Sequence, residues 1–149
     1  MQIDTTRFGA IEIKESELIH FPWGLPGFEE LKHFVLLEYR GGPFQWLQST
    51  EEPTVAFVVC PPQVLGIEYR IPAVKLEPIR LDRGEDILIL NIVSFNRQQN
   101  SIQFHLRSPL LFNAVSRVGY QWTMDSEEVD RNLVIPEGLS GSSGSLLKK

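Results

Sequence analysis

Hydrophobic and polar residues alternate with a period of two along several stretches of the chain. Ile11 and Ile13 alternate with charged residues, and residues 102–107 place Ile, Phe and Leu between polar side chains. Residues 118–124 repeat the pattern with Val, Tyr, Trp and Met. A period of two puts apolar side chains on one face of an extended strand, whereas a helix has a period of about 3.6. The pattern therefore predicts half-buried β-strands in these stretches.

Two further stretches, residues 54–60 and 87–95, are apolar almost without interruption and rich in Val and Ile. Such runs are typical of central strands that are covered on both faces. We therefore expect these two strands to lie in the middle of a sheet.

Turn signals separate the predicted strands. Residues 40–43, Arg-Gly-Gly-Pro, connect the strands predicted at 34–39 and 44–48 and indicate a hairpin. A second hairpin is predicted to turn at residues 97–100. Helical signals are weak, with one turn predicted at residues 28–32 and another at 126–130, where Ser126 serves as the N-cap.

Many short strands with few helical signals predict an all-β domain whose antiparallel sheet closes or folds on itself, as a barrel or a sandwich. The predicted domain spans residues 1–136. From residue 137 the composition changes to Gly, Ser, Leu and Lys. Residues 137–149 are therefore predicted to form a flexible Gly/Ser-rich C-terminal tail.

Charge and cysteine content narrow the function classes. The 149 residues include 14 basic and 19 acidic ones, a net charge of −5, which argues against a protein that mainly grips phosphate backbones. Cys60 is the single cysteine, so the chain can form no internal disulfide, and a reducing compartment is expected. Residues 1–10 lack the pattern of a secretory signal, and no apolar stretch is long enough to cross a membrane. We expect a cytoplasmic protein that does not contact membranes.

The residues give little support to an enzyme. His20, His33 and His105 have no metal-ligand spacing to one another or to acidic residues. Cys60 ends an apolar strand before two prolines and is expected to be a small buried hydrophobe rather than a nucleophile. The paired glutamates fall in predicted turns, where carboxylates are usually solvated. We therefore expect no catalytic residues, no metal site and no cofactor.

Direct binding of single-stranded RNA is the alternative function. Small barrels bind single strands through aromatic platforms beside a basic groove. Candidate platform residues lie on the predicted strands: Phe44, Trp46, Tyr69, Phe95 and Phe104. The arginines are scattered singly along the chain, however, and alternating aromatic residues in strands more often belong to a core.

Two segments combine stiffness with many apolar side chains. Residues 21–28 read Phe-Pro-Trp-Gly-Leu-Pro-Gly-Phe, in which prolines fix the backbone and glycines permit tight reversals. Their four large apolar side chains cannot all point inward from so short a loop. Residues 44–53 form the second segment. We expect some of these side chains to plug one end of the barrel and others to form a rigid partner-binding patch, which loses little entropy on binding.

These segments resemble the flagellar assembly factor FliW family. The resemblance rests on the motif at residues 21–28 and the Trp-Leu-Gln-Ser motif at 46–49, in this order and spacing. Phe8-Gly9 near the start and Ala-Phe-Val-Val at residues 56–59 also match, so the likeness covers most of residues 1–124. It implies an all-β, single antiparallel β-barrel-like domain with one or two short helical turns.

The resemblance also implies a non-enzymatic, partner-switching function. Members of this family bind the translational repressor CsrA away from its RNA groove, and they bind newly made flagellin. Export of flagellin then frees the factor, which relieves repression of flagellin translation. On this basis the expected partners are CsrA and flagellin, with no direct contact to nucleic acid, and the free protein is expected to be monomeric.

The two segments supply the predicted site. The contact candidates for partner binding are Trp23, Leu25, Gln48, Ser49 and Glu52. The residues expected to hold the shape of the motifs are Phe21, Pro22, Gly24, Pro26, Gly27, Phe28, Trp46, Leu47, Pro53, Pro61 and Pro109.

Overall fold

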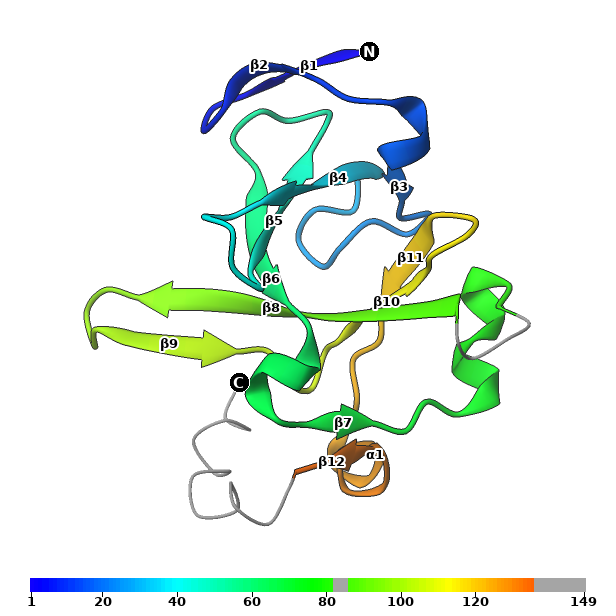
Figure 1. Ribbon diagram of the computed structural model, residues 1–149. Coiled ribbons are helices and arrows are strands. Elements are labelled where there is room, and N and C mark those ends of the chain that lie inside the picture. Colours follow the sequence, from blue (N-terminus) through cyan, green and yellow to red (C-terminus); the bar gives the residue numbers. More distant parts are fainter. Residues whose placement is uncertain (82–85, 136–149) are drawn as a thin grey trace.

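In the computed structural model, which describes residues 1–81 and 86–135, β-strands are the main element (Figure 1). The strands are β1 (Gln2–Thr5), β2 (Gly9–Glu12), β3 (Ile19–His20), β4 (His33–Glu38), β5 (Gln45–Ser49), β6 (Ala56–Cys60), β7 (Glu68–Tyr69), β8 (Ile87–Asn96), β9 (Ser101–Phe104), β10 (Leu110–Asn113), β11 (Val118–Gln121) and β12 (Leu133–Val134). One α-helix, α1 (Ser126–Asn132), and short 3-10 turns at Glu15–Glu17, Pro62–Leu65, Ala73–Lys75 and Glu77–Ile79 complete this part of the chain.

Seven strands close into a barrel in the order β10-β11-β3-β4-β5-β6-β8, and β8 pairs with β10 to complete the circle. Closure confirms the predicted barrel, because it leaves these strands without a free edge along their paired lengths. The pairings are antiparallel with one difference from the prediction. β3 and β11 run parallel and meet at His20 and Val118. They are far apart in the sequence, so no hairpin constrains their relative direction.

Three smaller units extend from the barrel (Figure 1). The β1–β2 hairpin lies over one end, and α1 lies beside the paired strands β7 and β12 at the other end. The third unit is a two-stranded ribbon, formed where the outer half of β8 pairs with β9. Figure 1 shows this β8–β9 ribbon projecting sideways from the barrel.

Both predicted hairpins are confirmed, since β4 pairs with β5 and β8 pairs with β9. The helix at 126–130 also exists, but it begins one residue earlier than predicted, because Asp125 rather than Ser126 is the N-cap. The Asp125 side chain accepts a hydrogen bond from the Glu128 N–H, and the Glu128 side chain accepts one from the Asp125 N–H. This reciprocal pair is a capping box. Residues 28–32 form only a turn, with the Leu31 N–H donating to the Phe28 carbonyl at 3.1 Å.

The barrel strands are covered on both faces. Alternate residues point into the barrel and form one core, in which Phe21 packs edge-to-face on Phe34 and Phe112. The opposite face packs against α1 and the 3-10 segments in a second cluster that contains Trp122 and Val129. This two-sided burial explains why β6 and the first part of β8 read as continuous apolar runs.

Cys60 is fully buried at the end of β6, and this burial raises the pKa of its thiol to about 11. The thiol therefore stays protonated near neutral pH, which fits the predicted role of a small buried hydrophobe. No helix of the described residues is both long and apolar enough to cross a membrane. The predicted tail, residues 137–149, lies outside the described residues.

Candidate partner-binding surface

The loop between β3 and β4 is fixed by its own backbone. The Phe21 N–H donates to the Lys32 carbonyl at 2.7 Å, which ties the two ends of the loop together. Within it, the Gly24 N–H donates to the Phe21 carbonyl at 2.9 Å and the Phe28 N–H to the Leu25 carbonyl at 2.7 Å. The loop is thus two successive tight turns rather than a flexible connection.

Gly24 and Gly27 both have positive φ, of 64° and 85°. At Gly24 a Cβ atom would also lie 2.6 Å from the Cα of Glu29, so a side chain would push the two turns apart. At Gly27 there is open space. The predicted shape-holding roles of these glycines therefore have a physical basis, which is stronger at Gly24.

The Glu29 carboxylate closes the second turn by accepting a hydrogen bond from the Gly27 N–H at 3.0 Å. This bond, together with one from its own backbone N–H, lowers the pKa of the Glu29 carboxyl. The side chain is exposed, so the loop presents a fixed negative charge at the surface.

The loop turns one aromatic side chain outward. Phe21 and Leu25 are buried in the barrel, whereas Trp23 is 57% exposed. The Trp23 ring meets the Tyr120 ring edge-to-face at a centroid distance of 6.2 Å. Tyr120 is held in turn by donating its hydroxyl to the Lys75 carbonyl at 2.6 Å, and burial raises its pKa to about 12. Trp23 is therefore an exposed side chain on a rigid support.

A shallow groove runs beside Trp23. Its first hollow, of about 280 Å³, is lined by Trp23, Gly24, Pro26, Glu29, Tyr120 and Gln121. The second, of about 310 Å³, shares Pro26 and Gln121 and continues along Leu25, Phe57, Ile92, Ser94, His105, Ser108 and Thr123. We call the two together the Trp23 groove. Ser94 and His105 are joined there by a hydrogen bond between Oγ and Nε2. Apolar patches beside small polar groups are typical of a protein-binding surface.

The Trp-Leu-Gln-Ser motif at residues 46–49 does not form an exposed surface like that around Trp23. Its polar side chains instead hold the turn between β5 and β6. Gln48 is fully buried, and its amide nitrogen lies within hydrogen-bonding distance of the carbonyls of Ser49, Pro53 and Val55. The buried Ser49 hydroxyl accepts hydrogen bonds from the N–H groups of Glu51 and Glu52 at 3.1 and 2.9 Å. These two side chains satisfy backbone groups that the turn would otherwise leave unpaired.

Glu51 connects this turn to the end of the 21–32 loop. Its Oε1 accepts hydrogen bonds from the N–H groups of Lys32 and His33 at 2.6 and 3.0 Å, and Oε2 lies 3.5 Å from the His33 ring. Burial disfavours the charged form, but the His33 and Lys32 N–H groups and the His33 ring outweigh it, and the pKa of Glu51 is lowered. Glu52 is exposed and bonds to Thr54.

The predicted contact residues therefore fall into two groups. Trp23 and Glu52 are exposed, whereas Leu25, Gln48 and Ser49 are buried and offer a partner almost no side-chain surface. The structure places Trp23 against Tyr120 rather than against the 48–52 turn. Direct contact remains our prediction for Trp23 and Glu52; for the buried three, the structure shows a part in the fold instead.

The residues predicted to hold shape have mixed environments. Phe21, Gly24, Leu47 and Pro109 are buried, Pro22, Phe28, Trp46, Pro53 and Pro61 are half-buried, and Pro26 and Gly27 are exposed. Pro53 has a clear part, since its carbonyl accepts a hydrogen bond from the Thr6 N–H at 3.0 Å and so joins the turn to the β1–β2 hairpin.

Sequence reasoning missed six residues that line the Trp23 groove: Tyr120, Gln121, Ser94, His105, Ser108 and Thr123. The strand alternation at 118–124 had marked Tyr120 as a core-facing residue, and nothing in the sequence pairs it with residue 23. The parallel contact between β3 and β11 brings the two regions together.

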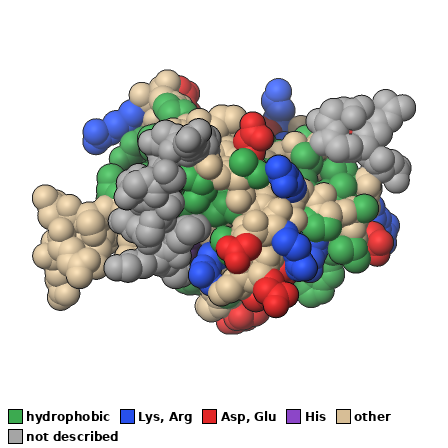
Figure 2. Space-filling view, turned by 90° about the horizontal axis from the view of Figure 1, so that it is seen from below, with side chains coloured by type: hydrophobic (Ala, Val, Ile, Leu, Met, Phe, Trp, Pro, Cys, Tyr) green, Lys and Arg blue, Asp and Glu red, His purple; other side chains and the backbone are tan. Residues whose placement is uncertain are grey.

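Metal sites and nucleic-acid sites each require a particular set of neighbouring side chains. Among the residues that the structure describes, no three His, Cys, Asp or Glu side chains gather as a metal site would require. Figure 2 shows the lower face, where acidic and basic side chains are interspersed outside the grey area. That visible part forms no continuous basic surface of the kind that binds a nucleic-acid backbone.

Comparison with known proteins identifies relatives of this fold. Residues 2–133 match the family model described as FliW protein. The flagellar assembly factors FliW of Leptospira interrogans and Syntrophus aciditrophicus are 37% and 38% identical, over 85% and 84% of this chain and 87% and 81% of theirs. That of Caldicellulosiruptor saccharolyticus is 30% identical over 91% of this chain and 90% of its own. A crystal structure of the flagellar assembly factor FliW matches with a TM-score of 0.76 and 30% identity, covering 85% of this chain and 90% of that one.

Proposed function

The chain belongs to the FliW family of flagellar assembly factors, and from this premise we propose that it is a non-enzymatic partner-switching protein of the cytoplasm. In this proposal it binds the translational repressor CsrA away from the RNA groove of CsrA, and it also binds flagellin. Flagellin export then frees the protein to antagonise CsrA, which couples flagellin translation to export.

One observation carries the proposal: the loop between β3 and β4 holds Trp23 exposed on a rigid support. A large aromatic side chain with a fixed backbone is the usual anchor of a protein interface, because little conformational entropy is lost when it is covered. The hollows beside it are shallow and lined by apolar and small polar side chains. Such a surface suits a segment of another protein.

Charge supports a basic partner. The chain carries a net charge of −5, and Glu29 sits ionised on the edge of the Trp23 groove. Negative charge near an interface increases the rate at which a basic protein associates. We therefore assign CsrA contacts to Trp23 and its groove, with Glu52 as a second candidate on the neighbouring turn.

Calorimetric titration with purified CsrA, and separately with flagellin, tests the proposal. Trp23→Ser should weaken binding of at least one partner about tenfold or more, as expected for an interface anchor. Val115→Ser is the matched control, because Val115 is 75% exposed and lies outside the groove. Equal melting temperatures for both variants would show that the loss is not caused by unfolding.

The two parts of the proposal fail in different ways. Unchanged affinity in Trp23→Ser would contradict the assigned surface but leave the function in place. No heat with either partner, from a protein shown to be folded, would contradict the function itself. Tight binding of bare single-stranded RNA that weakens steeply with salt would favour the alternative of direct RNA binding.

A further inference from the structure

The β8–β9 ribbon has one apolar face, and the barrel covers only the inner part of it, around Val93. Val93 pairs with Phe104 and Phe95 with Ile102, so the four side chains lie on the same face of the ribbon. Phe95 is 59% exposed and Ile102 is 54% exposed. Large side chains of this kind are costly to leave in water and commonly mark an interaction surface when they are contiguous.

The apolar face forms one side of a groove. The opposite side is the turn between β4 and β5, which contributes Tyr39 and Phe44, and Val58 of β6 completes the lining. The hollow measures about 190 Å³, and all of its lining residues are aromatic or aliphatic. We call it the ribbon groove. It is separate from the Trp23 groove, with which it shares no lining residue.

The outer edge of β9 is unpaired in the part of the chain that the structure describes. Within the described residues β9 pairs with β8 alone and ends the sheet. Natural edge strands are usually protected from further pairing by lysine, proline or a bulge. The β9 sequence, Ser-Ile-Gln-Phe, contains neither charge nor proline. Its unpaired backbone groups can therefore accept another extended chain.

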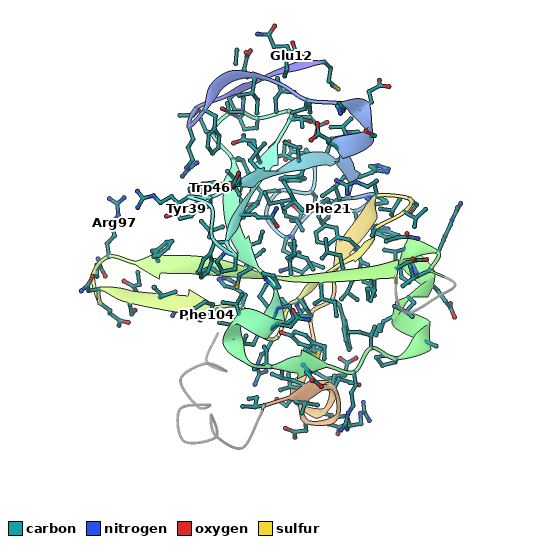
Figure 3. All side chains as sticks on the ribbon, in the orientation of Figure 1. Glu12, Phe21, Tyr39, Trp46, Arg97 and Phe104 are labelled. Atoms are coloured by element: carbon teal, nitrogen blue, oxygen red, sulfur yellow. The ribbon has the colours of Figure 1, made fainter. Side chains whose placement is uncertain are left out.

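Arginines flank this region although the whole chain is acidic. Arg97 lies in the turn of the ribbon, Arg40 stacks on Tyr39 with its guanidinium carbon 5.7 Å from the ring centroid, and Arg7 lies 4.3 Å above Trp46. A second hollow, which shares Tyr39 with the ribbon groove, is lined by Arg7, Phe8, Glu38, Tyr39, Arg40 and Trp46. Glu38 is the one carboxylate among the residues that line these two hollows. Figure 3 shows Arg97 at the outer end of the ribbon and Tyr39 and Trp46 on the neighbouring hairpin.

We propose that the ribbon groove binds an extended, acidic segment of a partner protein, which adds to the free edge of β9 as a further strand. Strand addition supplies backbone hydrogen bonds, and alternate side chains of the added strand supply specificity. Its apolar side chains lie beside Ile102 on the groove face, and its Asp or Glu side chains meet Arg97 in the turn of the ribbon. A second copy of this chain is a poorer occupant, because residues 97–104 contain Arg97 and no acidic residue.

Fluorescence anisotropy with a labelled peptide tests this inference on the full chain. The probe alternates acidic and branched apolar residues, Asp-Val-Glu-Ile-Glu-Val-Asp, and the reference peptide replaces every acid by Lys. We expect the acidic peptide to bind at least about tenfold more tightly. Methylation of alternate peptide nitrogens, on the edge that faces β9, should abolish binding because it removes the backbone donors.

Two variants locate the site. Ile102→Ser should weaken binding of the acidic peptide about fivefold or more, while Val115→Ser should not change it. Arg97→Glu should weaken the acidic peptide and strengthen the lysine peptide, which a merely unfolded ribbon would not do. Equal affinity for both peptides, or no effect of Ile102→Ser and Arg97→Glu, would overturn the proposal.

Self-association is the competing outcome. Sedimentation of the protein alone should show a monomer; a dimer lost in Ile102→Ser would mean that a second copy pairs with β9, and the proposal would be wrong. The inference does not rest on CsrA or flagellin. Failure of the peptide experiments therefore leaves the proposed function standing, and absence of CsrA and flagellin binding leaves the ribbon groove standing.

Discussion

Strand β8 lies in two environments, and the comparison between them explains much of this molecule. Its inner part belongs to the closed barrel, where Leu90, Ile92 and Val93 are buried. Its outer part belongs to the β8–β9 ribbon, where Phe95 is 59% exposed. Phe95 is as hydrophobic as the residues of the inner part, so the hydrophobicity of a residue did not by itself decide its burial. The neighbours did: β6 and β10 enclose the inner part, whereas the ribbon has β9 alone.

The same contrast separates the two proposed binding surfaces. The Trp23 groove is shaped by a loop whose turns are fixed by glycines and hydrogen bonds, so its exposed aromatic side chain stands on a barrel that is already closed. The ribbon groove is shaped by β9, which pairs with β8 on one side and, among the described residues, with no strand on the other. The first surface offers a rigid anchor, and the second offers unpaired backbone.

The largest expected difference in the free energy of unfolding is between replacing one phenylalanine in the barrel and one in the β8–β9 ribbon. Phe21 is fully buried and packs on Phe34 and Phe112 at centroid distances of 5.3 and 5.4 Å, so Phe21→Ala should lower the free energy of unfolding by about 3–5 kcal/mol. Phe95→Ala should change it by less than about 0.5 kcal/mol. Urea denaturation measures both. An equal cost at both positions would show that the ribbon is packed in solution.

Replacing Gly24 and Gly27 of the loop with alanine should give a smaller difference in the free energy of unfolding than the two phenylalanine substitutions. Gly24→Ala combines a positive φ with a Cβ placed 2.6 Å from Glu29, and we expect a loss of roughly 2–4 kcal/mol. Gly27→Ala has the strained backbone but open space, and should cost about 1 kcal/mol. Thermal melts of the two variants make the comparison, and a tolerant Gly24 would mean that the loop is looser than the structure shows.

One glutamine in the barrel and one in the ribbon should also differ in how much they stabilise the fold. Gln48→Ala removes a buried amide that serves the carbonyls of the 49–55 turn, and should cost about 1–3 kcal/mol. Gln103→Ala, on the exposed edge strand, should cost less than about 0.5 kcal/mol. If Gln48→Ala proved stable but bound partners weakly, Gln48 would be a contact residue after all. Chemical denaturation and partner titration on the same samples distinguish these results.

The smallest expected effect is the pH dependence of the stability that Glu51 contributes. The folded protein lowers the pKa of Glu51 below its usual 4.5, so the carboxylate stabilises the fold above that value and loses this contribution as pH falls through the lower, folded pKa. Glu51→Gln should therefore cost at most about 1 kcal/mol near pH 7, because the group is partly exposed to solvent. The difference from the parent protein should shrink as the solution is acidified towards pH 3.

Unfolding midpoints measured between pH 3 and pH 7 test this expectation. Glu52→Gln is the control, because the Glu52 side chain is exposed and accepts its hydrogen bonds from Thr54, within the same turn. A difference that grew in acid would contradict the assigned role of Glu51 in joining the turn to the loop.

Much of the architecture followed from the sequence. Local pattern and turn chemistry predicted the two hairpins, the buried runs in β6 and β8, and the short helix near residue 126. Each of these features depends on residues that are close together in the chain. The site was only half predicted. The stiffness of residues 21–28 was readable, and so was the conclusion that their apolar side chains could not all point inward, but not that Trp23 is the one turned outward.

The sequence by itself determined the strand periodicity, the turns and the resemblance that led to the family. Tertiary structure alone decided three things: the parallel contact of β3 with β11 that sets Tyr120 beside Trp23, the burial of Gln48 and Ser49, and the exposure of Phe95 and Ile102. The physical reason is common to all three. Whether a side chain meets water depends on which distant strands close around it, and closure of a barrel joins segments that local pattern treats as independent.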